Sequence, residues 1–173
     1  METQANQTGT VVAVCKKAQP GLPKYAVERI TIIAKHGVEG DYHAGAFIRH
    51  RWMAKQNPSQ PNHRQLLLTD TGIYAFLAEK DIHLEYGQLG ENIVLDGVDV
   101  MALKIGTVVA IGDARLEVTE IRRPCYQLNE MHPHLEDTVM PDKNDPATWN
   151  AGVMAVAAQG GVLQPGDPVQ VLD

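Results

Sequence analysis

The segment VVAIGDARLEVTEI, from Val108 to Ile121, determines the fold class more clearly than any other part of the chain. Two β-branched, apolar runs flank Gly112-Asp113, which is the pattern of a tight β-hairpin. In the second run Leu116 and Val118 alternate with polar residues, as expected for a strand with one buried face. We therefore expect two antiparallel strands here, joined by a short turn.

Similar short apolar runs occur on both sides of this hairpin, separated by glycines and prolines. They cover residues 10–15, 27–33, 65–68, 93–95, 153–157, 162–163 and 169–172. We expect the last three to form a closing meander. Helical spacing is clear at one place, where Thr69 or Asp70 caps a helix through about Lys80. Many short strands without regular helices between them predict a mainly β fold, either a barrel or a sandwich.

Three segments show no regular pattern. Residues 35–45 form a glycine-rich loop, residues 49–63 are polar and loop-like, and residues 132–150 read as an irregular excursion with three prolines. One or two helical turns are expected from Cys125 to Met131. We expect residues 1–9 to be a flexible tail and residues 10–173 to form a single domain.

The composition excludes several functional classes. The chain has 173 residues, 44% of them hydrophobic and 21% charged, with a net charge of -6. A negative chain does not attract nucleic acid or an anionic membrane, so an anionic ligand would need a local basic cluster. The N-terminal METQANQTGT has no apolar signal core, and no run approaches the roughly 18 apolar residues of a membrane helix. We expect a cytoplasmic protein.

The two cysteines, Cys15 and Cys125, are then expected to be reduced. Their spacing does not match a zinc motif. Cys15 lies in an apolar run without adjacent arginine, so we expect a core residue. His132 and His134 lack the further converging ligands that a metal site needs.

Cys125 stands in a different setting, because it follows Arg122-Arg123-Pro124 at the end of the hairpin. Proline restricts the residue before it to extended conformations, so the cysteine leaves the strand on a stiffened path. Nearby guanidinium groups, and the start of a helix, favour the thiolate, which is the form that acts as a nucleophile or soft metal ligand. The alternative is a small buried cysteine at a strand-to-helix corner.

Three further segments offer groups for an anionic, polar ligand. The glycine-rich loop ends in Gly40-Asp41-Tyr42-His43, where backbone N–H groups can approach a ligand; an ordinary connection capped by Asp41 is the alternative. Arg64 precedes a strand and can bind phosphate, or simply lie at the surface. Asn92 offers a donor and an acceptor to a polar ligand, or belongs to a plain turn.

Taken together, these segments resemble the MOSC domain, the C-terminal module of molybdenum cofactor sulfurases. The matching pieces, in the order of the family, are Gly37–His43, Arg64, Gly90–Ile93, Ile105–Gly112, Leu116–Thr119, Arg122–Cys125 with Leu128, and Gly160–Asp167. The resemblance implies a MOSC-type β-barrel with a few peripheral α-helices.

The resemblance also implies that the chain binds the molybdenum–pterin cofactor. Cys125 would then be the catalytic residue and the protein ligand to molybdenum. The residues implied around the pterin and its phosphate are Gly40, Asp41, His43, Arg64, Asn92 and Arg122.

The chain departs from the family pattern at two places. Many relatives have arginine where this chain has Tyr42, and the stretch from Arg49 to Asn62 is an unusual insertion. The pyridoxal-phosphate domain of the sulfurases does not fit into 173 residues, so we expect no pyridoxal phosphate in this chain.

Three functions follow from the resemblance. The first is a small molybdoenzyme that reduces N-hydroxylated compounds, with electrons from a separate donor protein. The second is a persulfide carrier in cofactor maturation, supplied by a cysteine desulfurase. The third is a non-enzymatic cofactor-binding module. In each case we expect a small-molecule ligand and neither nucleic acid nor a membrane as partner.

Overall fold

The hairpin predicted at residues 108–121 is present in the computed structural model, which describes residues 7–172. Strand β7 (Val108–Ile111) pairs antiparallel with β8 (Ala114–Ile121), and Ile111 lies opposite Ala114. Gly112 in the turn has a φ of 55°, a conformation that glycine adopts without strain. The tight turn between the two apolar runs is therefore confirmed.

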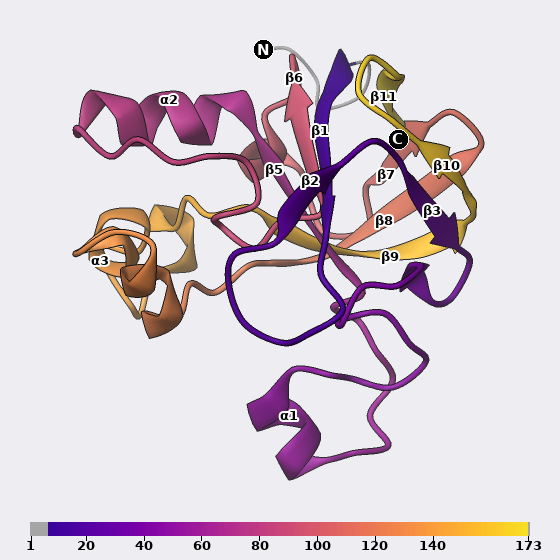
Figure 1. Ribbon diagram of the computed structural model, residues 1–173, viewed down its shortest axis with the longest axis horizontal. Helices are drawn as coiled ribbons and strands as arrows, with labels where there is room; N and C mark the ends of the chain where they lie inside the picture. The colour runs from indigo at the N-terminus through magenta and orange to yellow at the C-terminus, as the bar shows by residue number, and fades with distance from the viewer. Residues whose placement is uncertain (1–6, 173) are drawn as a thin grey trace.

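Seven strands form a closed barrel around the core (Figure 1). Their order is β11 (Pro168–Leu172), β7, β8, β9 (Val153–Gln159), β5 (Leu66–Asp70), β6 (Ile93–Asp96) and β1 (Thr8–Lys16), and β11 pairs with β1 to close the ring. Neighbouring strands are antiparallel except β5 and β6. Strand β2 (Tyr25–Val27) extends β1 outward. The predicted mainly β, barrel-type fold is confirmed.

A smaller sheet packs beside the barrel. It consists of β10 (Gly161–Leu163), β3 (Ile30–Ile33) and β4 (Gly37–Val38). The strand expected within residues 27–33 is β3, and Val27 belongs to β2 in the larger sheet. The predicted closing meander is wrong, because β9, β10 and β11 pair with other strands and not with each other.

The helices are short and lie outside the barrel. They are α1 (Arg51–Gln56), α2 (Thr71–Glu79), α3 (Leu135–Val139) and the 3-10 turns η1 (Val100–Ala102), η2 (Tyr126–Glu130) and η3 (Pro146–Thr148). Helix α2 makes the crossover that the parallel pair β5 and β6 requires. Its N-cap is Asp70, whose side chain accepts a hydrogen bond from the backbone N–H of Ile73, as predicted.

Helices α1 and α3 were not predicted, and β1 begins earlier than expected. Residues 49–63 and 132–150 were expected to be irregular, yet each contains a helix of one to two turns. Strand β1 begins at Thr8, inside the expected tail, and residues 1–6 of that tail lie outside the described residues. Among residues 7–172 no helix combines the length and apolar composition that a membrane span requires.

Candidate functional site

A cavity of about 310 Å³ lies against the barrel wall at β5 and β9. Leu67 and Met154 form its apolar floor: they face each other across the two strands, are buried, and lie outside the main core cluster. Side chains alternate along a strand, so Leu66 and Leu68 point into the core while Leu67 points out. The cavity therefore lies on the outer face of the barrel wall, and loops enclose it.

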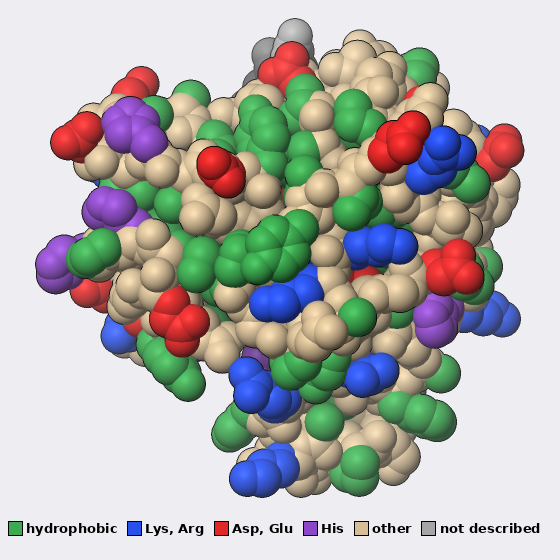
Figure 2. All heavy atoms as spheres, in the orientation of Figure 1, with side chains coloured by type: hydrophobic (Ala, Val, Ile, Leu, Met, Phe, Trp, Pro, Cys, Tyr) green, Lys and Arg blue, Asp and Glu red, His purple; other side chains and the backbone are tan. Residues whose placement is uncertain are grey.

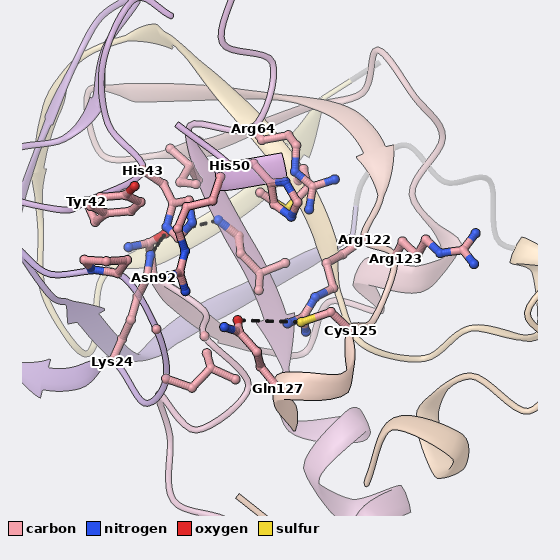
Figure 3. Close-up of a pocket in the computed structure, with 18 of the residues that line it drawn as sticks. Lys24, Tyr42, His43, His50, Arg64, Asn92, Arg122, Arg123, Cys125 and Gln127 are labelled. Carbon is pink, nitrogen blue, oxygen red and sulfur yellow. Dashed lines mark hydrogen bonds between the residues drawn. The ribbon is translucent and has the colours of Figure 1, made fainter. Parts of the chain in front are cut away.

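Most of the polar groups around the cavity come from these loops (Figure 3). The lining residues that can bind or react with a ligand include Lys24, His43, His50, Arg64, Asn92, Arg122 and Cys125. Five of these seven were predicted from the sequence to belong to one site, and they come from four separate segments of the chain. The structure thus brings together groups that are up to about 80 residues apart in sequence.

Cys125 lies at the edge of the cavity with a free, half-buried thiol. Pro124 is buried and separates it from β8, and the 3-10 turn η2 begins directly after it. The Sγ atom lies 3.9 Å from the Oε1 atom of Gln127. By contrast, Cys15 is completely buried in the barrel wall, as predicted, and burial raises the pKa of its thiol to about 12.

The two arginines before Cys125 point in different directions, because consecutive residues of an extended chain alternate. Figure 3 shows the guanidinium of Arg122 reaching toward the sulfur and that of Arg123 pointing away. The Arg123 guanidinium lies over the ring of Trp149, 5.4 Å from its centroid. Of the two predicted cations, Arg122 is therefore the one that faces the thiol.

Arg122 is a buried cation with few partners. It is 7% exposed, and the hydrogen bond recorded for its guanidinium, from Nη1 to the carbonyl of Ala151, is long at 3.3 Å. Burial lowers the pKa of Arg122; the sulfur of Cys125 acts in the opposite direction, and the guanidinium of Arg64 adds to the lowering. A guanidinium has five N–H donors, so most of its capacity is available to an anion in the cavity.

Arg64 lies nearby on the segment that leads into β5. Its Nη1 atom donates to the carboxylate of Glu120, and its side chain is 14% exposed. This ion pair fixes the guanidinium at the cavity wall while leaving other donors free. Arg64 therefore lies in the wall of the same cavity as Cys125.

Lys24, a buried lysine in the cavity wall, was not predicted from the sequence. Its Nζ atom donates to Asp41 at 2.8 Å and to the side-chain oxygen of Asn92 at 3.4 Å. A hydrogen bond of 2.9 Å from the Lys24 N–H to the Gly87 carbonyl holds its backbone in place, and only glycine fits at position 87, because a Cβ there would lie 2.1 Å from the Lys24 carbonyl oxygen. No local pattern marks this lysine, because only the path of the loop brings it to the cavity.

Two of the predicted residues, Gly40 and Asp41, lie outside the cavity wall. Asp41 is buried behind the cavity, where it accepts hydrogen bonds from Lys24 and from the backbone N–H groups of Lys17 and His43. Gly40, with a φ of 80°, precedes it and, like Asp41, is outside the residues that line the cavity. Both residues shape the loop that carries His43.

Asn92 lines the cavity but uses much of its hydrogen-bonding capacity within the protein. Its amide nitrogen donates to the carbonyl of Cys15, and its oxygen accepts from the backbone N–H of Leu67. Since Lys24 also donates to that oxygen, the side chain links β1, β5 and the buried lysine. Its clearest role is to hold these parts of the wall together.

Glu91, next to Asn92, is a completely buried carboxylate beneath the cavity. It accepts hydrogen bonds from the hydroxyls of Thr69 and Tyr74 and from the backbone N–H of Gly87. Burial raises the pKa of Glu91, and these hydrogen bonds oppose the change. The carboxylate ties β5, α2 and the turn before β6 together, which supports the wall from behind.

Two histidines face the cavity in the neutral form. Burial, followed by the charge of Lys24, lowers the pKa of His43 to about 3. Burial and the guanidinium of Arg64 lower the pKa of His50. The buried Nδ1 atom of His50 has no hydrogen-bond partner among residues 7–172, and such an atom in a cavity wall is available to a ligand.

The depressed pKa of His43 predicts how stability depends on pH. Below pH 6.5 the unfolded chain protonates this histidine, whereas the folded chain does so only near pH 3. Its contribution to stability is therefore present above pH 6.5 and is lost as the pH falls toward 3. We expect a loss of at most about 3 kcal/mol between pH 6.5 and 4, reduced by solvent screening.

The measurement is urea unfolding of the wild type and of His43→Gln across this pH range. Glutamine does not titrate, so the variant should show a flatter profile. His83→Gln is the matched control, because His83 is exposed and lies outside the cavity. If the free energy of unfolding depended on pH equally in the wild type and in His43→Gln, the prediction would be wrong.

Tyr42, where many relatives carry arginine, also lines the cavity. The guanidinium of Arg49 lies over its ring, 4.6 Å from the centroid. A cation–aromatic pair therefore occupies this part of the wall in place of a single arginine.

The chemistry of the site follows from these groups. One accessible thiol, several cations and an apolar floor suit a flat, anionic ligand. Among the described residues there is no group of three or more His, Cys, Asp or Glu side chains that could hold a metal ion. A metal at Cys125 would therefore have to arrive with most of its ligands supplied by a cofactor.

The family that matches the sequence is the MOSC domain, over residues 40–170. The chain belongs to the MOSC domain family. This match covers most of the barrel and the segments that carry His43, Arg64, Arg122 and Cys125. MOSC domains are associated with molybdenum cofactor proteins. None of the curated proteins matches the chain.

Solved structures show the same fold at low sequence identity. The YuaD protein from Bacillus subtilis has a TM-score of 0.79 and 17% identity, with 96% of each chain covered. YiiM from Geobacillus stearothermophilus and YiiM from Escherichia coli both have a TM-score of 0.64 and 19% identity. Each aligns with 95% of this MOSC chain, over 73% and 70% of its own length. At these low identities, the similarities show that the chain shares the fold of these proteins.

Proposed function

We propose that this MOSC protein binds the molybdenum–pterin cofactor in the cavity and reduces N-hydroxylated compounds, with Cys125 as the protein ligand to the metal. The observation that carries the proposal is the accessible thiol of Cys125 facing the buried, sparsely bonded guanidinium of Arg122. A thiolate is a soft ligand, and the guanidinium is suited to an anionic group beside it.

The residues present fit the cofactor in three respects. The apolar floor of Leu67 and Met154 can pack against a flat ring system. Arg64 and Arg122 supply donors for phosphate oxygens. The free Nδ1 atom of His50 offers a hydrogen-bonding group to the edge of a heterocycle.

When bound, the cofactor would supply the two-electron chemistry of molybdenum. The overall reaction consumes two electrons and two protons, converting R–NH–OH to R–NH₂ and water. The protein would hold the metal through the Cys125 sulfur and exclude water from one side of the cavity with its apolar floor. The neutral imidazoles of His43 and His50 would give hydrogen bonds without adding charge.

The first test measures molybdenum and pterin fluorescence in protein purified from cells with ample cofactor. We expect the wild type to retain both and Arg122→Met to lose at least about 10-fold in retention, since a hydrogen-bonded charge contributes about 1.5–3 kcal/mol. Arg115→Met is the matched control, because Arg115 bonds to backbone carbonyls of its own turn and lies outside the cavity.

The stability of the cofactor-free variants separates binding from folding. Arg122→Met should not lower the unfolding midpoint, because methionine fills similar space without burying a poorly paired charge. Normal retention in Arg122→Met would count against this site, and wild-type protein with neither molybdenum nor pterin would count against cofactor binding altogether.

A persulfide carrier is the second candidate, favoured by the half-buried, free thiol of Cys125. Mass spectrometry after incubation with a cysteine desulfurase distinguishes the two. A persulfide on Cys125 that moves to bound cofactor supports the carrier, whereas an unmodified thiol with bound molybdenum supports the reductase. Bound cofactor without either activity would leave the third expectation, a binding module.

A further inference from the structure

Residues 47–61 form an arm that projects from the barrel, and α1 lies at its end (Figure 1). The base of the arm is closed by a bridge between Phe47 and Pro61 and by a hydrogen bond from the Ile48 N–H to the Gln60 carbonyl. Helix α1 buries none of its six residues. Its surface is therefore available to another molecule. A helix this short is not stable alone, and contact with a partner would stabilise it.

The arm lies in a basic part of the sequence. Residues 42–69 contain no Asp or Glu, although the chain has 21, and they contain Arg49, Arg51, Lys55 and Arg64. The rest of the chain has 11 Lys and Arg against 21 Asp and Glu, a net charge of -10. In Figure 2 the lower part of the molecule, around α1, shows Lys and Arg without Asp or Glu.

Exposed aromatic rings accompany these charges. Phe47 is 57% exposed and Trp52 is 67% exposed. Arginine and tryptophan are enriched in protein–protein interfaces and among the residues that dominate their binding energy. The arm therefore combines positive charge with large apolar side chains, as protein-binding surfaces do.

The position of the arm connects this surface to the cavity. Arg51 and Trp52 also line the cavity, so a partner bound to the arm would lie beside the opening that leads to Cys125. The proposed reduction needs two electrons per turnover from outside. An electron donor at this place would approach the reacting centre without passing through the barrel.

We infer that the arm of residues 47–61 is the docking face for a small acidic redox protein, such as a flavin-mononucleotide protein, that delivers electrons to the cavity. This inference rests on the proposed function. Two reduced donors would each give one electron, and the two electrons with two protons convert R–NH–OH to R–NH₂ and water. A compact acidic protein fits better than a long polyanion, because a long polyanion would also meet the net charge of -10 carried by the rest of the chain.

The test uses the full chain, a bacterial flavodoxin as the acidic probe, and Lys55→Glu combined with Gln56→Glu. Both residues are exposed on α1, and neither lines the cavity. The control combines Lys143→Glu with Asn144→Glu, which are exposed, lie elsewhere on the protein and change the net charge equally. Calorimetry gives the Kd for flavodoxin, and steady-state kinetics give its KM.

We expect the arm variant to raise both constants at least about 10-fold at low salt and the control to change them less than about 2-fold. The difference should shrink at about 0.5 M salt, because the Debye length falls to a few ångströms. Turnover with reduced benzyl viologen, a small cation that the arm does not attract, should be the same in all three proteins.

Equal Kd values for flavodoxin in the arm variant and the control would overturn the inference. Tighter binding of duplex DNA or of anionic phosphatidylglycerol vesicles than of flavodoxin would do the same. Failure of the proposed function gives a different result: no molybdenum and no benzyl viologen turnover, with flavodoxin binding that is still weaker in the arm variant than in the control.

Discussion

Replacing Cys125 with serine should lower the rate of N-hydroxyl reduction at least about 1,000-fold, while the fold stays intact. A serine hydroxyl is a hard ligand and is not ionised near pH 7, so it does not replace a thiolate on a soft metal. The fold should tolerate the change, because the thiol is half-buried and the contact recorded for it is the long one to Gln127.

The measurement is turnover of a small N-hydroxylated amidine with reduced benzyl viologen, together with the urea unfolding midpoint. Cys15→Ala is the matched control: it removes the other cysteine from the buried barrel wall and should keep turnover. Full reductase activity in Cys125→Ser would reject the role proposed for this sulfur.

Replacing Glu91 with alanine should destabilise the protein by about 3–5 kcal/mol, the largest effect on stability that we expect. The change leaves three buried donors, the hydroxyls of Thr69 and Tyr74 and the N–H of Gly87, without their acceptor. The free energy of unfolding of a domain is only about 5–15 kcal/mol, so the variant would lose much of its stability.

Urea unfolding at neutral pH measures this effect. Glu117→Ala is the matched control, because Glu117 is exposed on β8 and its loss should change stability by no more than about 0.5 kcal/mol. Since Glu91 supports the turn that carries Gly90 and Asn92, cofactor retention should fall together with stability. A similar loss for both variants would show that the buried network contributes little.

Local sequence patterns predicted the elements that local interactions determine. The β7–β8 hairpin and the Asp70 cap of α2 were visible because the turn and cap residues lie beside the periodic runs that they join. The pairing of β9, β10 and β11 was not visible, because a strand's partner depends on residues far away in sequence. Helix α1 was missed because it has no buried face and hence no apolar period.

In the candidate site, too, some residues could be predicted from the sequence and others could not. His43, Arg64, Arg122 and Cys125 were predicted through the family resemblance and line one cavity. Lys24 could not be predicted in this way, since its place depends on a buried ion pair with Asp41. Asp41 lies behind the cavity wall because of the path of its loop, which the sequence did not predict.

The pairing of β11 with β1 has a consequence for the synthesis of this protein. The first and the last strand of the described chain close the barrel together, with Thr8 opposite Gln170. While the chain is still on the ribosome, β1 and β7 therefore lack a neighbour that the finished protein gives them. Unpaired strand edges are open to association with other chains, so nascent copies are at greatest risk just before β11 emerges.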